Sequence, residues 1–403
     1  MKLKKLAVAL SVALACATAS AAGISGDVVR IGVMTDMSGT YAEQTGAGSV
    51  LAAKMAIADF GGKVLGKPIE MVSADHQNKP DVATLLAKKW FDSDQVDMIT
   101  DIVTSSVALA VSQVAKEKNK PIIVTGAATH DLTGKACNSV TAHWVYDVIA
   151  LTRAAPAMVV ANGGKKWYFV TADYAFGHAL EGAASAGVKA AGGEVVGAVK
   201  FPFPGTTDFS AYLLRAQGSK ADVIGLANAG TDLVNSVKQA AEYGVTETQQ
   251  LVSLLGDLLA VHKLGLKDAQ GLTVTEGFYW DTDDQTRAFA KRFFEVHGKM
   301  PNMLQAGIYS AVTHYLKAVQ AAGTDDTEAV MAKMRELPVN DMMVRNGKLQ
   351  ANGRMKYDLK LFKVKKPSES KYPWDYYKVQ AVIPADKAFL PPEASGCPLT
   401  ANK

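Results

Sequence analysis

The stretch Met98–Thr129 has the residue pattern of a strand–helix–strand unit. It predicts a buried strand at 98–103, a hydroxyl-rich turn at 104–106, a helix with apolar residues at helical spacing, and a second strand at 121–125. In a parallel sheet, the loops after both strands lie at the edge where open α/β sheets bind ligands. The first loop also begins a helix, whose N–H groups and serine hydroxyls suit a carboxylate or another small anion. A second interpretation is that Ser105 only caps this helix.

Strand and helix patterns alternate through most of the chain, and the series occurs twice. The first series runs from Val29 to Trp144 and the second from Val148 to Thr275. Regular alternation predicts parallel sheets with helices on both faces. From Asp284 to Glu336, helices follow one another without strands, so they are expected to cover a sheet that already exists, and strand-like segments follow at 348–366 and 376–383. The predicted fold class is therefore α/β, with two doubly wound parallel-sheet lobes joined by a multi-strand hinge.

The order of these segments predicts a cleft that closes on a ligand. A chain that builds one lobe, builds the other and then returns must cross between them several times, and such crossings form a hinge. The predicted domains are a signal peptide at 1–22, the first part of lobe 1 at 23–146, the first part of lobe 2 at 147–279, a return to lobe 1 at 280–355, and a hinge strand, lobe 2 completion and C-terminal tail at 356–403.

The N-terminal segment has the features of a secretory signal peptide. Lys2, Lys4 and Lys5 precede an apolar run at 6–17, and Ala19-Ser20-Ala21 provides a small-residue cleavage site. Removing these lysines lowers the formal net charge from +4 to +1. A nearly neutral chain gives no support to nucleic-acid binding, and no later apolar run is long enough to cross a membrane. We therefore expect a periplasmic protein without membrane insertion of the mature chain.

Two cysteines remain after the predicted cleavage, because Cys16 lies within the signal peptide. Cys137 and Cys397 form an even pair in an oxidising compartment, where a disulfide is the expected state. This bond would join the C-terminal tail to a loop early in the chain. Closing such a long loop corresponds to roughly 4–5 kcal/mol in the chain-entropy treatment.

Sequence patterns for cofactors and catalysis are incomplete. Gly61, Gly66 and Lys67 have the spacing of a phosphate-binding loop, but Pro68 replaces the hydroxyl residue that would hold magnesium. The segment Gly46-Ala47-Gly48 lacks the third glycine of a dinucleotide site. No HExxH motif or Cys/His cluster predicts zinc, and no GxSxG motif predicts a nucleophilic serine. We therefore predict no cofactor, no metal and no enzymatic activity.

Short motifs follow the predicted strands in a recognisable order. They are Met37-Ser38-Gly39, Thr104-Ser105-Ser106, Gly126-Ala127-Ala128-Thr129, Asp173-Tyr174-Ala175-Phe176-Gly177 and Asp208-Phe209-Ser210. With these motifs, the chain resembles type I periplasmic binding proteins of the branched-chain amino acid transport family, the leucine/isoleucine/valine receptors of ABC importers. The resemblance covers essentially the whole mature chain. It implies two α/β lobes joined by three strands.

The resemblance also implies a set of ligand-binding residues. In lobe 1, the hydroxyl-rich loop and the backbone of the following loop would hold a ligand carboxylate, at Ser105, Ser106, Ala127, Ala128 and Thr129. In lobe 2, an aromatic side chain and a strand-end loop would close over the ligand, at Tyr174, Asn228, Gly230 and Thr231. The alternative for each residue is an ordinary turn or helix cap.

One position departs from the family's amino-acid receptors. Those receptors usually have an acidic residue after the lobe 2 strand at 251–254, where it pairs with the ligand ammonium. The aligned residue here is Leu255, and an apolar side chain does not compensate the cost of burying a cation. Asp257 substitutes for the missing acid if the register shifts by two residues. Otherwise the ligand has a carboxylate and no ammonium.

Other segments resemble the branch of this family that includes receptors for aromatic acids such as benzoate derivatives. These segments are 144–147, 172–180 and 395–398. Ring faces and phenol hydroxyls for such a ligand would come from Tyr41, Tyr174, Tyr279 and Trp280, and His130 is a further candidate donor.

The resemblance thus implies a solute-binding receptor that delivers a small organic carboxylate to an ABC transporter permease. An aromatic acid is the favoured ligand. Two alternatives stay open from the sequence: a branched-chain amino acid receptor for Leu, Ile or Val, and an enzyme built on the same two-lobed scaffold.

Overall fold

The computed structural model describes residues 23–153 and 155–400, and the predicted signal peptide lies outside the described residues. The first sheet has the strand order β2-β3-β1-β4-β5-β6. Its strands are β1 (Val29–Thr35), β2 (Lys63–Val64), β3 (Lys67–Asp75), β4 (Met98–Asp101), β5 (Ile122–Val124) and β6 (Thr141–His143). All neighbours pair in parallel except β2 and β3. This sheet, with its helices, is lobe 1.

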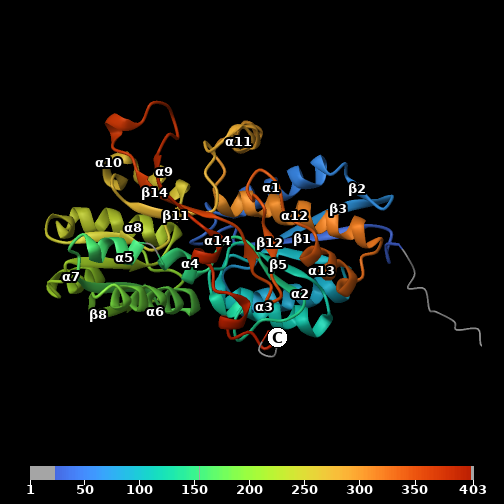
Figure 1. Ribbon diagram of the computed structural model, residues 1–403, viewed down its shortest axis with the longest axis horizontal. Helices are drawn as coiled ribbons and strands as arrows, with labels where there is room; N and C mark the ends of the chain where they lie inside the picture. Colours follow the sequence, from blue (N-terminus) through green and yellow to red (C-terminus); the bar gives the residue numbers. More distant parts are fainter. Residues whose placement is uncertain (1–22, 154, 401–403) are drawn as a thin grey trace, which may run out of the picture.

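Helices cover both faces of the lobe 1 sheet because alternate strand residues point to opposite sides. Val33 and Ile123 pack in one apolar cluster with α1 (Gly46–Asp59) and α12 (Met303–Ala322). Neighbouring strand residues pack in a second cluster with α2 (Pro80–Asp92) and α3 (Ser105–Lys118). The late helices α11 (Asp284–His297) and α13 (Thr327–Glu336) contact α1 and α12, respectively (Figure 1). Of the three late helices, α12 contacts β4 and β2 and so covers the sheet as predicted, whereas α11 and α13 pack on α1 and α12.

The second sheet is parallel, with the strand order β10-β9-β7-β8. Its strands are β7 (Lys166–Ala172), β8 (Glu194–Phe201), β9 (Val223–Ala227) and β10 (Gln250–Ser253). In Figure 1 its helices lie on both sides of the sheet. They are α4 (Val148–Thr152), α5 (Ala155–Ala161), α6 (Ala175–Ala190), α7 (Ser210–Gly218), α8 (Gly230–Glu242), α9 (Leu258–Leu264) and α10 (Leu266–Ala269). This sheet and its helices form lobe 2.

A third, antiparallel sheet was not anticipated as a separate unit. The strand expected at 272–275 is present as β11 (Thr273–Glu276), but it pairs with β14 (Leu359–Val364) and not with the lobe 2 sheet. The strand β15 (Tyr377–Ile383) completes this sheet. The difference arises because β14 and β15 belong to the returning chain, which local sequence patterns do not place in space. The remaining short elements are β12 (Lys348–Leu349), β13 (Met355–Lys356), α14 (Ala385–Ala388) and 3-10 turns at 130–132, 245–247, 367–369 and 392–394.

Three crossings connect the lobes: after β6, after β11 and before β14. The crossing segments contact one another, because the Tyr357 hydroxyl donates to the carbonyl of Val145 over 2.8 Å. A Cβ at Gly277 would lie 2.2 Å from the same hydroxyl, so only glycine fits there. The α/β class with two parallel-sheet lobes is therefore confirmed, while the residue limits of the domains stay predictions.

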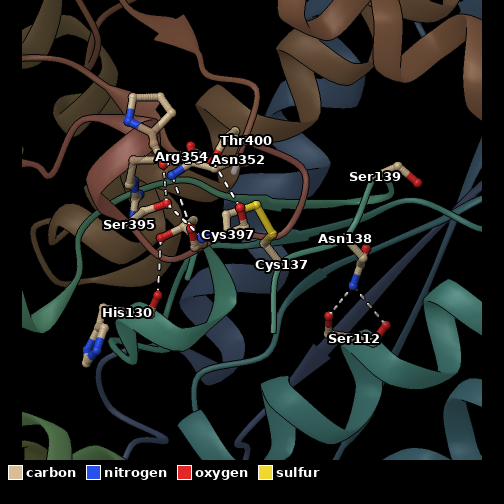
Figure 2. The surroundings of a disulfide bond; sticks show 12 residues. Ser112, His130, Cys137, Asn138, Ser139, Asn352, Arg354, Ser395, Cys397 and Thr400 are labelled. Atoms are coloured by element: carbon tan, nitrogen blue, oxygen red, sulfur yellow. Dashed lines mark hydrogen bonds between the residues drawn. A yellow bond between two sulfur atoms is a disulfide. The ribbon is translucent and has the colours of Figure 1, made fainter. Parts of the chain in front are cut away.

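The predicted disulfide is present between Cys137 and Cys397, whose Cα atoms are 5.6 Å apart (Figure 2). It joins the C-terminal tail to the loop before β6 of lobe 1. The tail also reaches lobe 2, because the Arg153 guanidinium donates to the carbonyl of Lys387 over 2.9 Å. Within residues 23–153 and 155–400, no helix meets the length and hydropathy of a membrane span, and no group of potential metal ligands is close enough to hold an ion.

Candidate ligand-binding site

A small cavity lies between the two lobes, with about 20 Å³ of space open to the centre of a water-sized sphere. Most of its wall is apolar or aromatic, and its polar side chains are two carboxamide or carboxylate groups and three phenols. The lobe 1 side and its crossing segments contribute Tyr41, Gln44, Val103, Gly126, Ala128, Tyr146, Met303 and Leu304. Lobe 2 contributes Tyr174, Phe176, Ala229, Gly230, Leu255 and Asp257.

The lobe 1 wall is formed by the loops that follow β4 and β5, and hydrogen bonds tie these loops together. The Ser105 hydroxyl accepts from the backbone N–H groups of Ala128 and Thr129, over 3.3 and 3.2 Å. A Cβ at Gly126 would lie 2.7 Å from the Cα of Val103, so the two loops approach as closely as glycine allows. The wall is therefore held by backbone geometry, with little room for adjustment.

Helix N-termini face the cavity from lobe 2. Tyr174, Ala229 and Asp257 line the cavity and are the N-cap residues of α6, α8 and α9. No side chain caps α6 or α8, whereas the Asp257 carboxylate caps α9 by accepting from the Ala260 N–H over 2.8 Å. Uncapped helix N-termini present N–H donors and partial positive charge, which favour an anion.

The two lobes touch at the cavity rim. The hydroxyls of Tyr41 and Tyr174 are hydrogen-bonded across the interface. The backbone N–H of Thr231 donates to the carbonyl of Thr40 over 3.1 Å. The ring of Phe203 stacks on Tyr174, with centroids 4.0 Å apart, and its centroid is 5.7 Å from that of Tyr41. The structure therefore shows the lobes closed over the cavity.

Burial sets the charge of the site. It raises the pKa of the Asp257 carboxyl to about 6 and that of Asp232, at the rim, to about 7. Burial also raises the pKa of the Tyr41 and Tyr174 phenols well above their usual range, so both stay neutral donors. Among the described residues that line the cavity there is no Lys, Arg or His. Positive potential at the site therefore comes from backbone N–H groups.

The predicted binding residues occupy different places. Four of them line the cavity directly: Tyr41, Ala128, Tyr174 and Gly230. Five lie behind the wall or at its rim: Ser105 supports the loop backbone, Ala127 and Asn228 are fully buried, the Thr129 hydroxyl caps a short turn at 130–132, and Thr231 lines an adjoining hollow between the lobes. Ser106 is only half-buried and does not line the cavity.

Three candidate residues lie elsewhere. Tyr279 packs against Phe362 and Tyr377 in the third sheet, and its hydroxyl donates to the carbonyl of Trp374. The Trp280 indole donates to the same carbonyl over 3.0 Å. His130 lines a separate small pocket beside Arg354. Tyr279 and Trp280 follow β11, and the pairing of β11 with β14 carries them away from the cavity.

Sequence reasoning did not select eight residues of the wall as ligand-binding: Gln44, Val103, Gly126, Tyr146, Phe176, Ala229, Met303 and Leu304. A local signal existed for the last two, because Asn302 and Gln305 form a capping box that begins α12 at Met303. That signal locates a helix start but not its proximity to the cleft. Leu255 and Asp257 both line the cavity, so the structure brings together the two residues between which the sequence left a choice.

Comparisons with known proteins agree with this geometry. The family described as periplasmic binding protein matches residues 28–371. A curated relative, the Leu/Ile/Val-binding protein homolog 6 of Brucella melitensis, is 27% identical over 341 residues, covering 82% of this chain and 85% of its own length. A crystal structure of a periplasmic binding protein from Burkholderia mallei is 49% identical, with a TM-score of 0.91, and the alignment covers 93% of this chain and 99% of that one.

Two further solved structures extend the comparison. A branched chain amino acid ABC transporter periplasmic ligand-binding protein from Burkholderia xenovorans is 42% identical, with a TM-score of 0.81 and coverage of 92% and 100%. A solute binding protein from R. palustris in complex with benzoate is 23% identical, with a TM-score of 0.81 and coverage of 92% and 100%, and shares the fold. With a family match over most of its length and two lobes closed on a cavity, the chain belongs to the type I periplasmic binding proteins.

Proposed function

We propose that this solute-binding protein captures a small organic carboxylate, preferably an aromatic acid, and presents it to an ABC transporter permease in the periplasm. The lobes close around the ligand, and no bond is made or broken. The observation that carries the proposal is the cavity wall, where four aromatic rings and three larger apolar side chains surround the space: Tyr41, Tyr146, Tyr174, Phe176, Leu255, Met303 and Leu304. Such a wall favours an apolar ring.

The carboxylate is proposed to lie at the loops after β4 and β5, where Ala128 lines the cavity. The N–H groups of Ala128 and Thr129 donate to the Ser105 hydroxyl, so that the proton of this hydroxyl is left to donate to another acceptor. Backbone N–H groups and a hydroxyl bind a carboxylate by charge-assisted hydrogen bonds. No Lys or Arg is required for this arrangement, in agreement with the lining residues.

A branched-chain amino acid is the second candidate, because Asp257 lines the cavity. With a pKa of about 6, this carboxyl is mostly ionised at neutral pH and is able to pair with a ligand ammonium. The name of the 42% identical Burkholderia xenovorans protein points the same way. Against this candidate, one Asp257 oxygen is already engaged by the first turn of α9, and Leu255 occupies the aligned position.

Calorimetric titration of refolded, ligand-free protein distinguishes these candidates. The ligands are benzoate, cyclohexanecarboxylate, benzamide and leucine. Benzoate is expected to bind most tightly, with benzamide at least roughly tenfold weaker because it lacks the anionic charge. Tighter binding of leucine would favour the amino-acid receptor, and absence of binding by every acid would refute the proposal. Recovery of benzoate chemically unchanged after prolonged incubation argues for a receptor, and its conversion would argue for an enzyme.

A further inference from the structure

The cavity wall contains an acceptor that no donor of the described protein reaches. Gln44 is 4% exposed and lines the cavity, and its side-chain oxygen Oε1 has no hydrogen-bond partner among the described residues. Leaving a buried acceptor unpaired is costly, while a polar group at a binding site gains its partner when the ligand arrives. Gln44 Oε1 is therefore available to accept a hydrogen bond from a bound ligand.

The orientation of the Gln44 side chain follows from its neighbours. Gln44 and Asp257 line the same cavity, and the Gln44 side chain lowers the pKa of the Asp257 carboxyl against the larger effect of burial. An ionised carboxylate only accepts, so the amide nitrogen faces Asp257 and Oε1 is left for another donor. The backbone is fixed as well, since Gln44 N–H donates to Tyr41 and the Gln44 carbonyl accepts from Asn302, each over 3.0 Å.

Closure of the lobes brings lobe 2 directly to this acceptor. A Cβ at Gly230 would lie 3.3 Å from Gln44 Oε1 and 2.5 Å from the carbonyl of Thr40. The glycine therefore keeps the space beside Oε1 open while the lobes are in contact. Because Gln44 belongs to lobe 1 and Asp257 to lobe 2, the two acceptors come together only in the closed form.

We propose that the ligand carries a hydrogen-bond donor, a hydroxyl or an amino group, that binds Gln44 Oε1 beside Asp257. This inference rests on the proposed function and narrows its ligand class to carboxylic acids with a donor substituent. The acceptor pair repels the ligand carboxylate, which places the donor and the carboxylate at different points of the wall. An acid with no donor leaves Oε1 unpaired in the closed form.

The first test needs only the wild-type protein. We compare benzoate with its 2-, 3- and 4-hydroxy derivatives and with the corresponding methoxy acids, which accept hydrogen bonds but do not donate them. One hydroxy isomer is expected to bind about tenfold or more tightly than both benzoate and its methoxy partner. Leucine is tested separately, because its ammonium group would be the donor in place of a hydroxyl. Equal affinities of benzoate and all hydroxy acids would overturn the inference.

The second test asks whether the donor group of the ligand binds Gln44. In Gln44→Met, which keeps the length of the side chain and removes the acceptor, the preference for the hydroxy acid or leucine over the donor-free acid is expected to fall to about twofold or less. Gln113→Met, on the exposed face of α3, is the matched control and should keep the full preference. A preference retained in Gln44→Met would overturn the inference. If the variant does not fold, the wild-type series still decides.

The outcomes separate this inference from the proposed function. If the acids bind without a donor preference, the proposed function stands and the inference fails. If none of the acids binds and leucine does, the aromatic-acid proposal fails, and loss of leucine binding in Gln44→Met supports the donor contact on its own. If neither acids nor leucine bind, both proposals fail.

Discussion

The lobe 1 wall of the cavity includes two short loops whose groups are hydrogen-bonded to one another, whereas most residues of the lobe 2 wall lie at helix N-termini. In lobe 1, Ser105 joins the two loops, and Gly126 lets them approach closely. In lobe 2, Tyr174 and Gly230 contact lobe 1 directly. The difference indicates that lobe 1 provides a preformed binding surface, and that lobe 2 adds contacts that exist only after closure.

Removing the disulfide should have the largest effect on stability and leave binding nearly unchanged. The bond closes a loop with a sequence separation of 260, and neither cysteine lines the cavity. In the chain-entropy treatment its loss costs about 5 kcal/mol. Urea denaturation of the Cys137→Ser/Cys397→Ser double variant measures the stability, and calorimetry measures the affinity. A large loss of affinity in the folded double variant would show that the C-terminal tail also affects ligand binding.

The next largest effect is expected from Asp232, on the lobe 2 side of the rim. Burial raises its folded pKa from 3.8 to about 7, so the folded protein holds this proton where the unfolded chain has lost it. Its contribution to stability is therefore full below about pH 4 and is lost as the pH rises to about 7, by at most about 4 kcal/mol.

Asp232→Asn removes this titration. Compared with wild type, the variant should become relatively more stable between pH 4 and pH 8, and thermal unfolding across that range measures the trend. A constant difference between variant and wild type would show that Asp232 is solvated in the unliganded protein, and thus that the lobes are mostly open in solution.

Gly230→Ala tests closure by lobe 2. A Cβ there would lie 2.5 Å from the Thr40 carbonyl of lobe 1, and the φ angle of 62° disfavours any other residue. Affinity is expected to fall by 10- to 100-fold, roughly 1.4–2.7 kcal/mol, with a smaller change in stability. Gly182→Ala in α6 is the control, because nothing lies within 4 Å of its Cβ position. Undiminished affinity in Gly230→Ala would contradict closure as a condition for binding.

Ser105→Ala tests the lobe 1 binding surface and should have the smallest effect. Ser105 is 1% exposed and bonds to two backbone N–H groups, whereas Ser106 is half-buried and outside the wall. Losing the hydroxyl removes the two bonds that hold the Ala128 loop in place and the donor proposed for the ligand, and should weaken carboxylate binding by about 1–2 kcal/mol. Calorimetry should show no change for Ser106→Ala. Equal effects of the two substitutions on affinity would show that Ser105 caps its helix and has no role in ligand binding.

Much of the lobe 1 binding surface was predictable, because it follows from local patterns. The strand–turn–helix pattern around Ser105 and the small-residue loop at Ala128 place both loops at one sheet edge. The lobe 2 side was only partly predictable. Tyr174 and Gly230 begin helices directly after strands, but Phe203 lies in a loop whose stacking on Tyr174 and Tyr41 joins segments far apart in the chain.

The sequence by itself determined the alternation of strands and helices, the parallel sheets and the even pair of cysteines, because these depend on residue periodicity and composition over short distances. Only the tertiary structure decided which residues face the cavity. It assigned β11 to a third sheet, removed Tyr279 from the cavity wall, and placed Gln44 of lobe 1 beside Asp257 of lobe 2. The physical reason is that the cavity forms where two separately folded lobes meet, so its contacts depend on the hinge and not on neighbouring residues.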